Sequence, residues 1–447
     1  MSETLPIICV TENGVKTANI SETHRAWARS NGFVGQSGKL LALPDKEGEI
    51  GAYLFGLGSE VNRSALVLGL AASALAAGTY RLEGDYGDPT LASLGFRLGA
   101  YRFDRYAEAK DQPVLELPEG ADAAEIENLV TSAFIARDLV NIPANDLGPD
   151  AFEAWIAEFA ETHGVEVKVI RDDDLLAQNF PMIHAVGRAS DQAPRLVDFS
   201  WGDAANPKLT LVGKGVTFDT GGLNIKPGSS MALMKKDMGG AANVLGLANA
   251  IMTAGLKVRL RVLVPVVENS IAGNAFRPGD VLPSRKGLTV EIGNTDAEGR
   301  LILADALALA DEEQPDLIID MATLTGAARV ALGPDLPPVY ARDGAFAKTL
   351  IEHGMAIDDP LWEMPLWNGY DKLLASKIAD VSHISTGGLA GSITAALFLN
   401  RFVRPETEWM HLDIFAWAPE ARPGRPFGGT DQGVRALYGA LKDRYGQ

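Results

Sequence analysis

The chain has 447 residues, more than a single hydrophobic core usually supports, so two domains are expected. Hydrophobic residues make up 47% and charged residues 22%, which is typical of an ordinary globular protein. The 40 Lys and Arg against 58 Asp and Glu give a net charge of −18, which argues against sequence-independent binding to nucleic acid. The single cysteine, Cys9, excludes an internal disulfide framework and a cysteine-rich zinc site, and is interpreted as a buried core residue.

Residues 1–118 are predicted to form a small amino-terminal α/β domain with an accessory or oligomer-forming role. Short apolar runs, as at 7–10 and 52–57, alternate there with turn-rich segments. The uncharged stretch 64–80 is shorter than the roughly 20 residues of a membrane span, so we predict a packed helix over 65–77. No basic segment followed by a long apolar stretch opens the sequence, so we expect a cytoplasmic protein without membrane partners.

A linking helix is predicted within residues 119–142, because apolar residues such as Ile126, Leu129 and Phe134 recur there at helical spacing. Pro143 disfavours its continuation. The remaining residues, 143–447, are predicted to form the larger, catalytic domain.

In this larger domain apolar strands alternate with helices, which predicts an α/β fold with a mixed, mostly parallel sheet sandwiched by helices. Ligands of such sheets collect beyond the carboxyl ends of the strands. Lys214, Asp296 and Thr323 each follow a different predicted strand, so we expect them at one sheet edge. The predicted strands are 166–170, 209–212, 258–267, 288–292, 317–321 and 409–414, and the principal helices are 241–254 and 301–311.

Two dense segments carry the chemistry. In NTDAEGRL, at 294–301, Asp296 and Glu298 stand two apart and Arg300 opens a predicted helix. The second segment, 212–240, contributes two lysines and two aspartates: Lys214, Asp219, Lys226 and Asp237. A few hard oxygen ligands, an amine and a spare arginine are what a two-metal hydrolytic site requires.

Other signals are weaker. VGKG at 212–215 has too few glycines ahead of its lysine for a phosphate-binding loop. None of the six histidines has the spacing HExxH or another paired-ligand spacing. His411, in the apolar run MHLDI, is interpreted as a core histidine, or one that supports a ligand from behind, and not as a metal ligand.

The segments VGKGVTFDTGGLNIKPG, MKKDMGGAA and NTDAEGRLILADAL resemble the signature segments of the leucyl (cytosol) aminopeptidase family, hexameric dinuclear metallo-exopeptidases. ARDLVNIPANDLGP at 136–149 resembles the family's stretch before the catalytic domain. The resemblance is strong over roughly 125–447 and loose over the first 110 residues.

The resemblance implies a role for each matching position. Two divalent metal ions, Mn²⁺ or Zn²⁺, would be held by Lys214 and Asp237 on one ion, by Asp296 on the other, and by Asp219 and Glu298 between them. Lys226 would polarise the scissile carbonyl, and Arg300 would hold a bicarbonate ion as general base. Substrate contacts are implied for Met234, Asn294, Thr323, Leu324 and Gly326.

The resemblance therefore implies an aminopeptidase that hydrolyses the amino-terminal bond of short peptides with a free amino terminus, and a homohexamer. Phe415 and Trp417 stand where many members of the family have small residues near the substrate pocket, so a preference for leucine is not carried over. If these two residues reach the pocket, they are expected to narrow it. Two alternatives remain at this point. One is a dinuclear phosphoesterase, for which a basic phosphate-binding cluster is missing; the other is a non-catalytic binding protein on the same scaffold, although no ligand position is lost.

Overall fold

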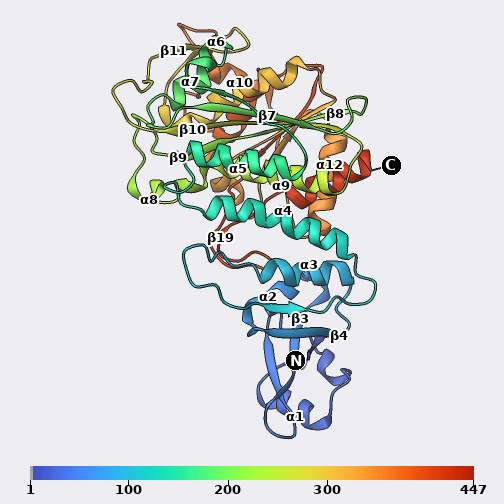
Figure 1. Ribbon diagram of the computed structural model, residues 1–447. Coiled ribbons are helices and arrows are strands. Elements are labelled where there is room, and N and C mark those ends of the chain that lie inside the picture. Colours follow the sequence, from blue (N-terminus) through green and yellow to red (C-terminus); the bar gives the residue numbers. More distant parts are fainter. Residues whose placement is uncertain (1–3, 447) are drawn as a thin grey trace. The chain divides into compact units, whose positions relative to one another are not determined.

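The computed structural model describes residues 4–446, which divide into two compact units (Figure 1). The first unit contains the described residues up to Thr131 together with residues 356–358 and 418–428, and the second contains the remainder. The predicted limits of the domains at 118 and 142 stay a prediction.

The first unit is built on a five-stranded sheet with the order β2-β3-β1-β4-β5, in which only β2 runs antiparallel to its neighbour. Its strands alternate their side chains between two cores: Ile7 and Cys9 pack with α2 and α3, and Val10 packs with α1. The elements are β1 (Leu5–Thr11), η1 (Gly14–Lys16), α1 (Glu22–Ser30), β2 (Leu40–Pro44), β3 (Ile50–Gly58), η2 (Glu60–Asn62), α2 (Leu68–Ala74), β4 (Gly78–Gly84), α3 (Pro89–Gly99) and β5 (Pro113–Leu115).

The helix predicted over 65–77 is shorter than expected. Only Leu68–Ala74 is helical, because the cap residue Leu75 is already extended and β4 begins at Gly78. Cys9 is buried, as predicted, with 3% of its surface exposed. Within residues 4–446 no helix has both the length and the apolar character needed to cross a membrane.

The second unit contains a nine-stranded mixed sheet, which confirms the predicted fold class. Its order is β15-β14-β17-β13-β8-β10-β7-β6, with β9 paired to β10. The central neighbours β17, β13, β8 and β10 are parallel, whereas β7, β6 and β14 introduce the antiparallel pairs. The strands are β6 (Lys168–Arg171), β7 (Arg195–Trp201), β8 (Lys208–Gly213), β9 (Gly215–Asp219), β10 (Arg259–Asn269), β13 (Leu317–Ala322), β14 (Pro338–Ala341), β15 (Trp362–Glu363) and β17 (Glu408–Asp413).

Helices cover both faces of this sheet, with α7 and α10 on one side and α5 and α9 on the other (Figure 1). The predicted linking helix exists as α4 (Ala123–Asn141). The other helices are α5 (Pro149–Thr162), α6 (Asp173–Ala177), α7 (Pro181–Gly187), α8 (Gly228–Met231), η3 (Met234–Met238), α9 (Gly239–Thr253), η4 (Thr295–Ala297), α10 (Gly299–Glu312), α11 (Gly326–Leu332), α12 (Gly344–Ala356), η5 (Asn368–Leu374), α13 (Gly391–Asn400) and α14 (Val434–Tyr445).

One predicted strand lies outside the large sheet. Residues 288–292 were expected to bring Asp296 to the same edge as Lys214 and Thr323, but β12 (Thr289–Glu291) pairs with β11 (Val281–Pro283) and β16 (Val381–Ser382) in a separate small sheet. The membership of this strand in the large sheet was therefore predicted wrongly, because β12 has three residues and is already paired on both sides. Asp296 nevertheless lies on the same cavity as Lys214 and Thr323. A further pair of short strands is formed by β18 (Trp417–Ala418) and β19 (Gly428–Gly429).

Candidate active site

The carboxyl ends of the central strands carry the first group of candidate residues. Lys214 directly follows β8, Asp219 ends β9, and Thr323 directly follows β13. Because β8, β9 and β13 all run parallel to their neighbours in the centre of the sheet, these residues emerge at one edge. Thr323 Oγ1 donates to Asp237 Oδ1 at 2.8 Å, which fixes the aspartate of η3 beside this edge.

The segment after β12 reaches the same place through hydrogen bonds. Thr295 Oγ1 donates to Gly221 O at 2.6 Å and accepts from Asn224 N at 2.8 Å, so this segment is fastened to the loop after β9. Asn269, the buried last residue of β10, donates through Nδ2 to both Thr295 O and Asp219 Oδ1. The side chain of Asn294 accepts from Asp296 N at 2.9 Å and caps η4.

These elements bring two lysines and four carboxylates together. Lys214 Nζ lies 2.7 Å from Asp237 Oδ2 and 2.9 Å from Glu298 Oε1. Lys226 Nζ lies 2.8 Å from Asp219 Oδ2 and 2.5 Å from an Asp296 oxygen. Gly299 leaves room for the side chain of Lys214, because a Cβ at this position would lie 2.4 Å from Cε of Lys214.

The carboxylates have spare ligand capacity. One oxygen from each of Asp219, Asp296 and Glu298 lies within 4.8 Å of the other two. Both oxygens of Glu298 and one each of Asp237 and Asp296 are buried without a hydrogen bond of regular geometry to any of the described residues. Three of these four oxygens lie within ion-pair distance of Lys214 or Lys226, and the second oxygen of Glu298 has no partner among the described residues. Burying so many carboxylates together is costly to the protein, and hard oxygen ligands of this kind suit divalent cations. The residues present therefore fit divalent metal ions.

Burial and mutual charge shift the pKa values in this cluster. Burial raises the pKa of Glu298 to about 7, and the neighbouring charge of Asp219 adds to the effect. Burial alone would lower the pKa of Lys214, but Asp237, Glu298 and Asp219 outweigh it and raise the pKa of this ammonium. A lysine must lose its proton to bind a metal, so loading this site should release protons.

The cluster lines a cavity of about 460 Å³ in the second unit. Every predicted site residue except Glu298 lines it, and Glu298 is buried behind Lys214. The predicted substrate contacts on the wall are Met234, Asn294, Thr323, Leu324 and Gly326. The structure thus brings all twelve residues to one place.

Arg300 lies in the first turn of α10 and also lines the cavity. Its Nη1 donates to His383 O at 2.8 Å, whereas its buried Nε has no hydrogen-bond partner among residues 4–446. Burial lowers the pKa of Arg300 to about 10, which still leaves the guanidinium charged at neutral pH. A small anion would satisfy this side chain.

Sequence reasoning missed residues that hold the site from outside. Asn269 orients Asp219, although the two are 50 positions apart. His383 Nε2 lies 2.9 Å from Asn294 O, and burial lowers the pKa of His383 to about 4, so the neutral ring supports the segment of the metal-ligand candidates. The sequence offered one signal for these residues: Asn269, a polar side chain at the end of the apolar run that forms β10. His411 is a core residue, as predicted, with Nδ1 at 2.5 Å from Asp320.

The expectation for Phe415 and Trp417 is wrong, because neither residue lines the cavity. The ring of Phe415 instead lies against the side chains of Lys236 and Arg329, which do line it. Trp417 contacts Lys235, at 5.6 Å from Nζ to the ring centre. Phe415 therefore supports the wall from behind, and neither aromatic residue narrows the cavity.

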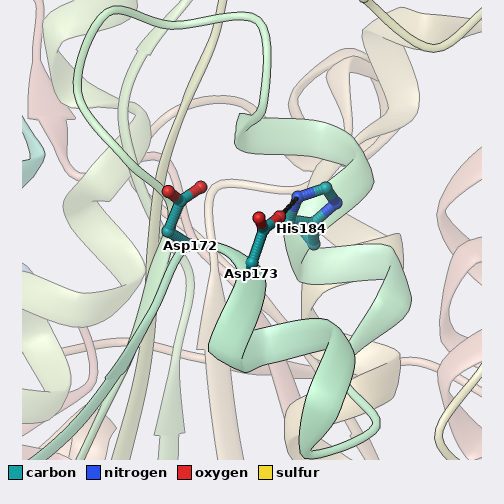
Figure 2. A group of neighbouring side chains, drawn as sticks. All are labelled: Asp172, Asp173 and His184. Carbon is teal, nitrogen blue, oxygen red and sulfur yellow. Dashed lines mark ion pairs between the residues drawn. The ribbon is translucent and has the colours of Figure 1, made fainter.

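A second group of possible ligands occurs at α6 and α7, where Asp172 and Asp173 approach His184 (Figure 2). His184 Nε2 lies 3.5 Å from Asp173 Oδ1. Both aspartates are exposed to solvent, and exposed acids in such a group are common without a metal. The group contains none of the predicted site residues.

Fold and site together define a metal-dependent hydrolase of the α/β class. The chain belongs to the cytosol aminopeptidase family: the model of the family's catalytic domain matches residues 134–438, and the model of the M17 aminopeptidase N-terminal domain matches residues 13–118. It is therefore a metallo-aminopeptidase, and the predicted family is confirmed.

Relatives and solved structures agree with this assignment. A probable cytosol aminopeptidase of Syntrophotalea carbinolica is 38% identical over 460 aligned positions, which cover 92% of each chain. The crystal structure of cytosol aminopeptidase from Coxiella burnetii matches with a TM-score of 0.93 and 42% identity over 100% of this chain and 98% of that one. The bottromycin maturation enzyme BotP in complex with Mn matches with a TM-score of 0.90 and 34% identity over 99% and 100%.

Proposed function

We propose that this metallo-aminopeptidase removes the amino-terminal residue from short peptides with a free amino terminus, using two divalent metal ions. The observation that carries the proposal is the cluster of four carboxylates around Lys214 and Lys226, in which one oxygen of Glu298 has no partner among the described residues. Lys214 and Asp237 would hold one ion, Asp296 the other, and Asp219 and Glu298 would lie between them. When bound, such ions act as Lewis acids and lower the pKa of water.

Manganese is the first candidate metal, since a related structure contains Mn, and zinc is the second. The test is an assay of aminoacyl anilides and aryl phosphates with Mn²⁺ or Zn²⁺ added to metal-free protein. Hydrolysis of the anilides alone supports the proposal. Hydrolysis of the phosphates alone would favour the dinuclear phosphoesterase, and hydrolysis of neither would favour a non-catalytic binding protein. Family membership supports the aminopeptidase.

Lys226 is proposed to stabilise developing charge on the substrate. Its Nζ is anchored between Asp219 and Asp296 at the cavity wall, and an ammonium has three N–H donors. The remaining donor can face the carbonyl oxygen on which negative charge develops. Such preorganised donors are usually the largest electrostatic contribution to catalysis.

Replacing Lys226 with Met should lower kcat by roughly 10²–10³, the scale of losing one oxyanion donor, and should change KM little. The matched control is Lys235→Met, because Lys235 Nζ donates a hydrogen bond to Asn141 O at 2.7 Å and the residue does not line the cavity. Steady-state kinetics of the two variants on one anilide make the comparison. A Lys226 variant with unchanged kcat would exclude this role.

Arg300 is proposed to hold a bicarbonate ion, which would supply a general base. Support comes from its buried Nε without a hydrogen-bond partner among the described residues. We expect added bicarbonate to accelerate the wild type and to have little effect on Arg300→Met, which keeps an unbranched side chain but removes the guanidinium and its charge. Rates measured across a bicarbonate titration decide this. Equal stimulation of both proteins would remove Arg300 from the role.

Two further proposals rest on the family alone. A homohexamer is proposed and can be tested by light scattering on the purified protein. Action in the cytosol is supported by the name of the relatives and can be tested by fractionation of cells.

A further inference from the structure

Two basic side chains on the cavity wall have no part in the proposed mechanism. Lys236 lies in η3 directly before Asp237, and Arg329 lies in α11, one turn after Gly326. Both line the cavity. Both also lie against Phe415, with Nζ of Lys236 at 5.1 Å and Cζ of Arg329 at 4.6 Å from the centre of its ring. They therefore form one cationic patch, the Lys236–Arg329 wall.

This wall has few anionic partners inside the protein. Arg329 donates through Nη1 to Thr325 O at 2.9 Å, and none of the carboxylates of residues 4–446 lies within ion-pair distance of it. Among residues 4–446, Lys236 pairs with Asp237 at 3.9 Å, and that carboxylate lies closer to Lys214, at 2.7 Å. Within the described part of the chain the wall therefore has no close carboxylate partner of its own.

The guanidinium of Arg329 lies beside Gly326. A Cβ at this glycine would lie 3.6 Å from Arg329 Nη2, in van der Waals contact. Met234 begins the same element as Lys236, and Gly326 begins the same helix as Arg329. The wall is thus carried by the two elements that also carry predicted substrate contacts.

A carboxylate is the chemical group that this wall fits. A guanidinium remains charged at all working pH values and binds a carboxylate through two parallel hydrogen bonds. The Nζ of Lys236 can donate a hydrogen bond whether or not it carries the extra proton.

We propose that the Lys236–Arg329 wall binds the side-chain carboxylate of an amino-terminal glutamate or aspartate, so that the enzyme prefers acidic first residues. This inference rests on the proposed aminopeptidase function and names its substrate class. The wall begins 3.9 Å from the Asp237 carboxylate, beside the cluster where the reacting end of the peptide must lie. From there the first side chain of a bound peptide can reach the wall.

The test compares the tripeptide amides Glu-Ala-Ala-NH₂, Leu-Ala-Ala-NH₂ and Lys-Ala-Ala-NH₂ on metal-loaded protein. The blocked carboxyl terminus leaves the first side chain as the only carboxylate. We expect the wild type to favour Glu over Leu in kcat/KM by at least about tenfold. Arg329→Met should lower kcat/KM for the Glu peptide by roughly 10- to 100-fold, as for a lost hydrogen bond to a charged group, and leave the Leu peptide within about threefold.

Two more variants separate recognition from packing. Arg329→Glu reverses the charge at the wall, so the preference should move from the Glu peptide to the Lys peptide, which a purely structural role of Arg329 would not produce. Lys236→Met should also reduce the preference for Glu, whereas Lys235→Met, one position away and outside the cavity wall, should keep it.

The outcomes distinguish this inference from the function on which it rests. A metal-loaded wild type that cleaves none of the three peptides contradicts the proposed function itself. Cleavage without a preference for Glu over Leu overturns only the inference, as does an Arg329→Met variant that loses activity on both peptides equally. If Arg329→Met instead weakens only Leu-Ala with a free carboxyl terminus, the wall binds the terminal carboxylate and the inference is wrong.

Discussion

Glu298→Gln is expected to lower the affinity for divalent metal by more than about 100-fold and to abolish most peptidase activity. The reason is that Glu298 contributes two buried oxygens without regular hydrogen bonds, one of them 2.9 Å from Lys214 Nζ. Losing a residue outside the ligand sphere costs about 10–100-fold in affinity, and a direct ligand should cost more. Glutamine keeps the shape of the side chain but removes its charge.

Metal binding also gives a readout that needs no substrate. Adding Mn²⁺ or Zn²⁺ to metal-free wild type should raise its melting temperature, because the ions bind only the folded state. The Glu298→Gln variant should lose that rise while remaining folded. Glu312→Gln is the matched control: it is the same substitution in the same helix, on an exposed side chain paired with Arg285 at 2.7 Å. An equal rise in all three proteins would show that Glu298 is not a ligand.

The architecture was accessible from the sequence because local patterns set it. Apolar runs such as 209–212 and 317–321 correspond to β8 and β13, and the alternation with helices fixed the class of sheet. β12 was misplaced because a three-residue strand carries no sign of its partner. Its pairing with β11 and β16 depends on contacts between distant segments.

In the site, too, residues close in sequence could be predicted together, whereas residues on distant elements could not. Asp296, Glu298 and Arg300 are close in sequence, so their proximity in space follows from one short segment. The Lys236–Arg329 wall could not be found in this way, because its two members belong to different elements and meet only through the ring of Phe415. The partnership of Asn269 with Asp219 likewise requires β9 and β10 to be paired.

The last prediction concerns the end of the peptide that the enzyme reads. Acetylating the amino terminus of a good substrate is expected to reduce kcat/KM by several orders of magnitude, whereas amidating its carboxyl terminus should change it little. A free amine can act as a metal ligand or donate hydrogen bonds to carboxylates, and the cavity presents Asp219, Asp296 and Asp237 on its wall. An acetyl amide has no such amine and adds bulk in a cavity of about 460 Å³.

Competition separates the two reasons for this loss. An acetylated peptide that still binds should inhibit cleavage of the free peptide with a Ki near that peptide's KM, which would assign the missing amine to the reaction itself. An acetylated peptide that does not inhibit has lost binding, which assigns the amine and the space around it to substrate recognition. In both cases the enzyme needs the free terminus. Efficient turnover of amino-blocked peptides would instead show that the same carboxylates and lysines serve an endopeptidase, and the proposal of an exopeptidase would have to be abandoned.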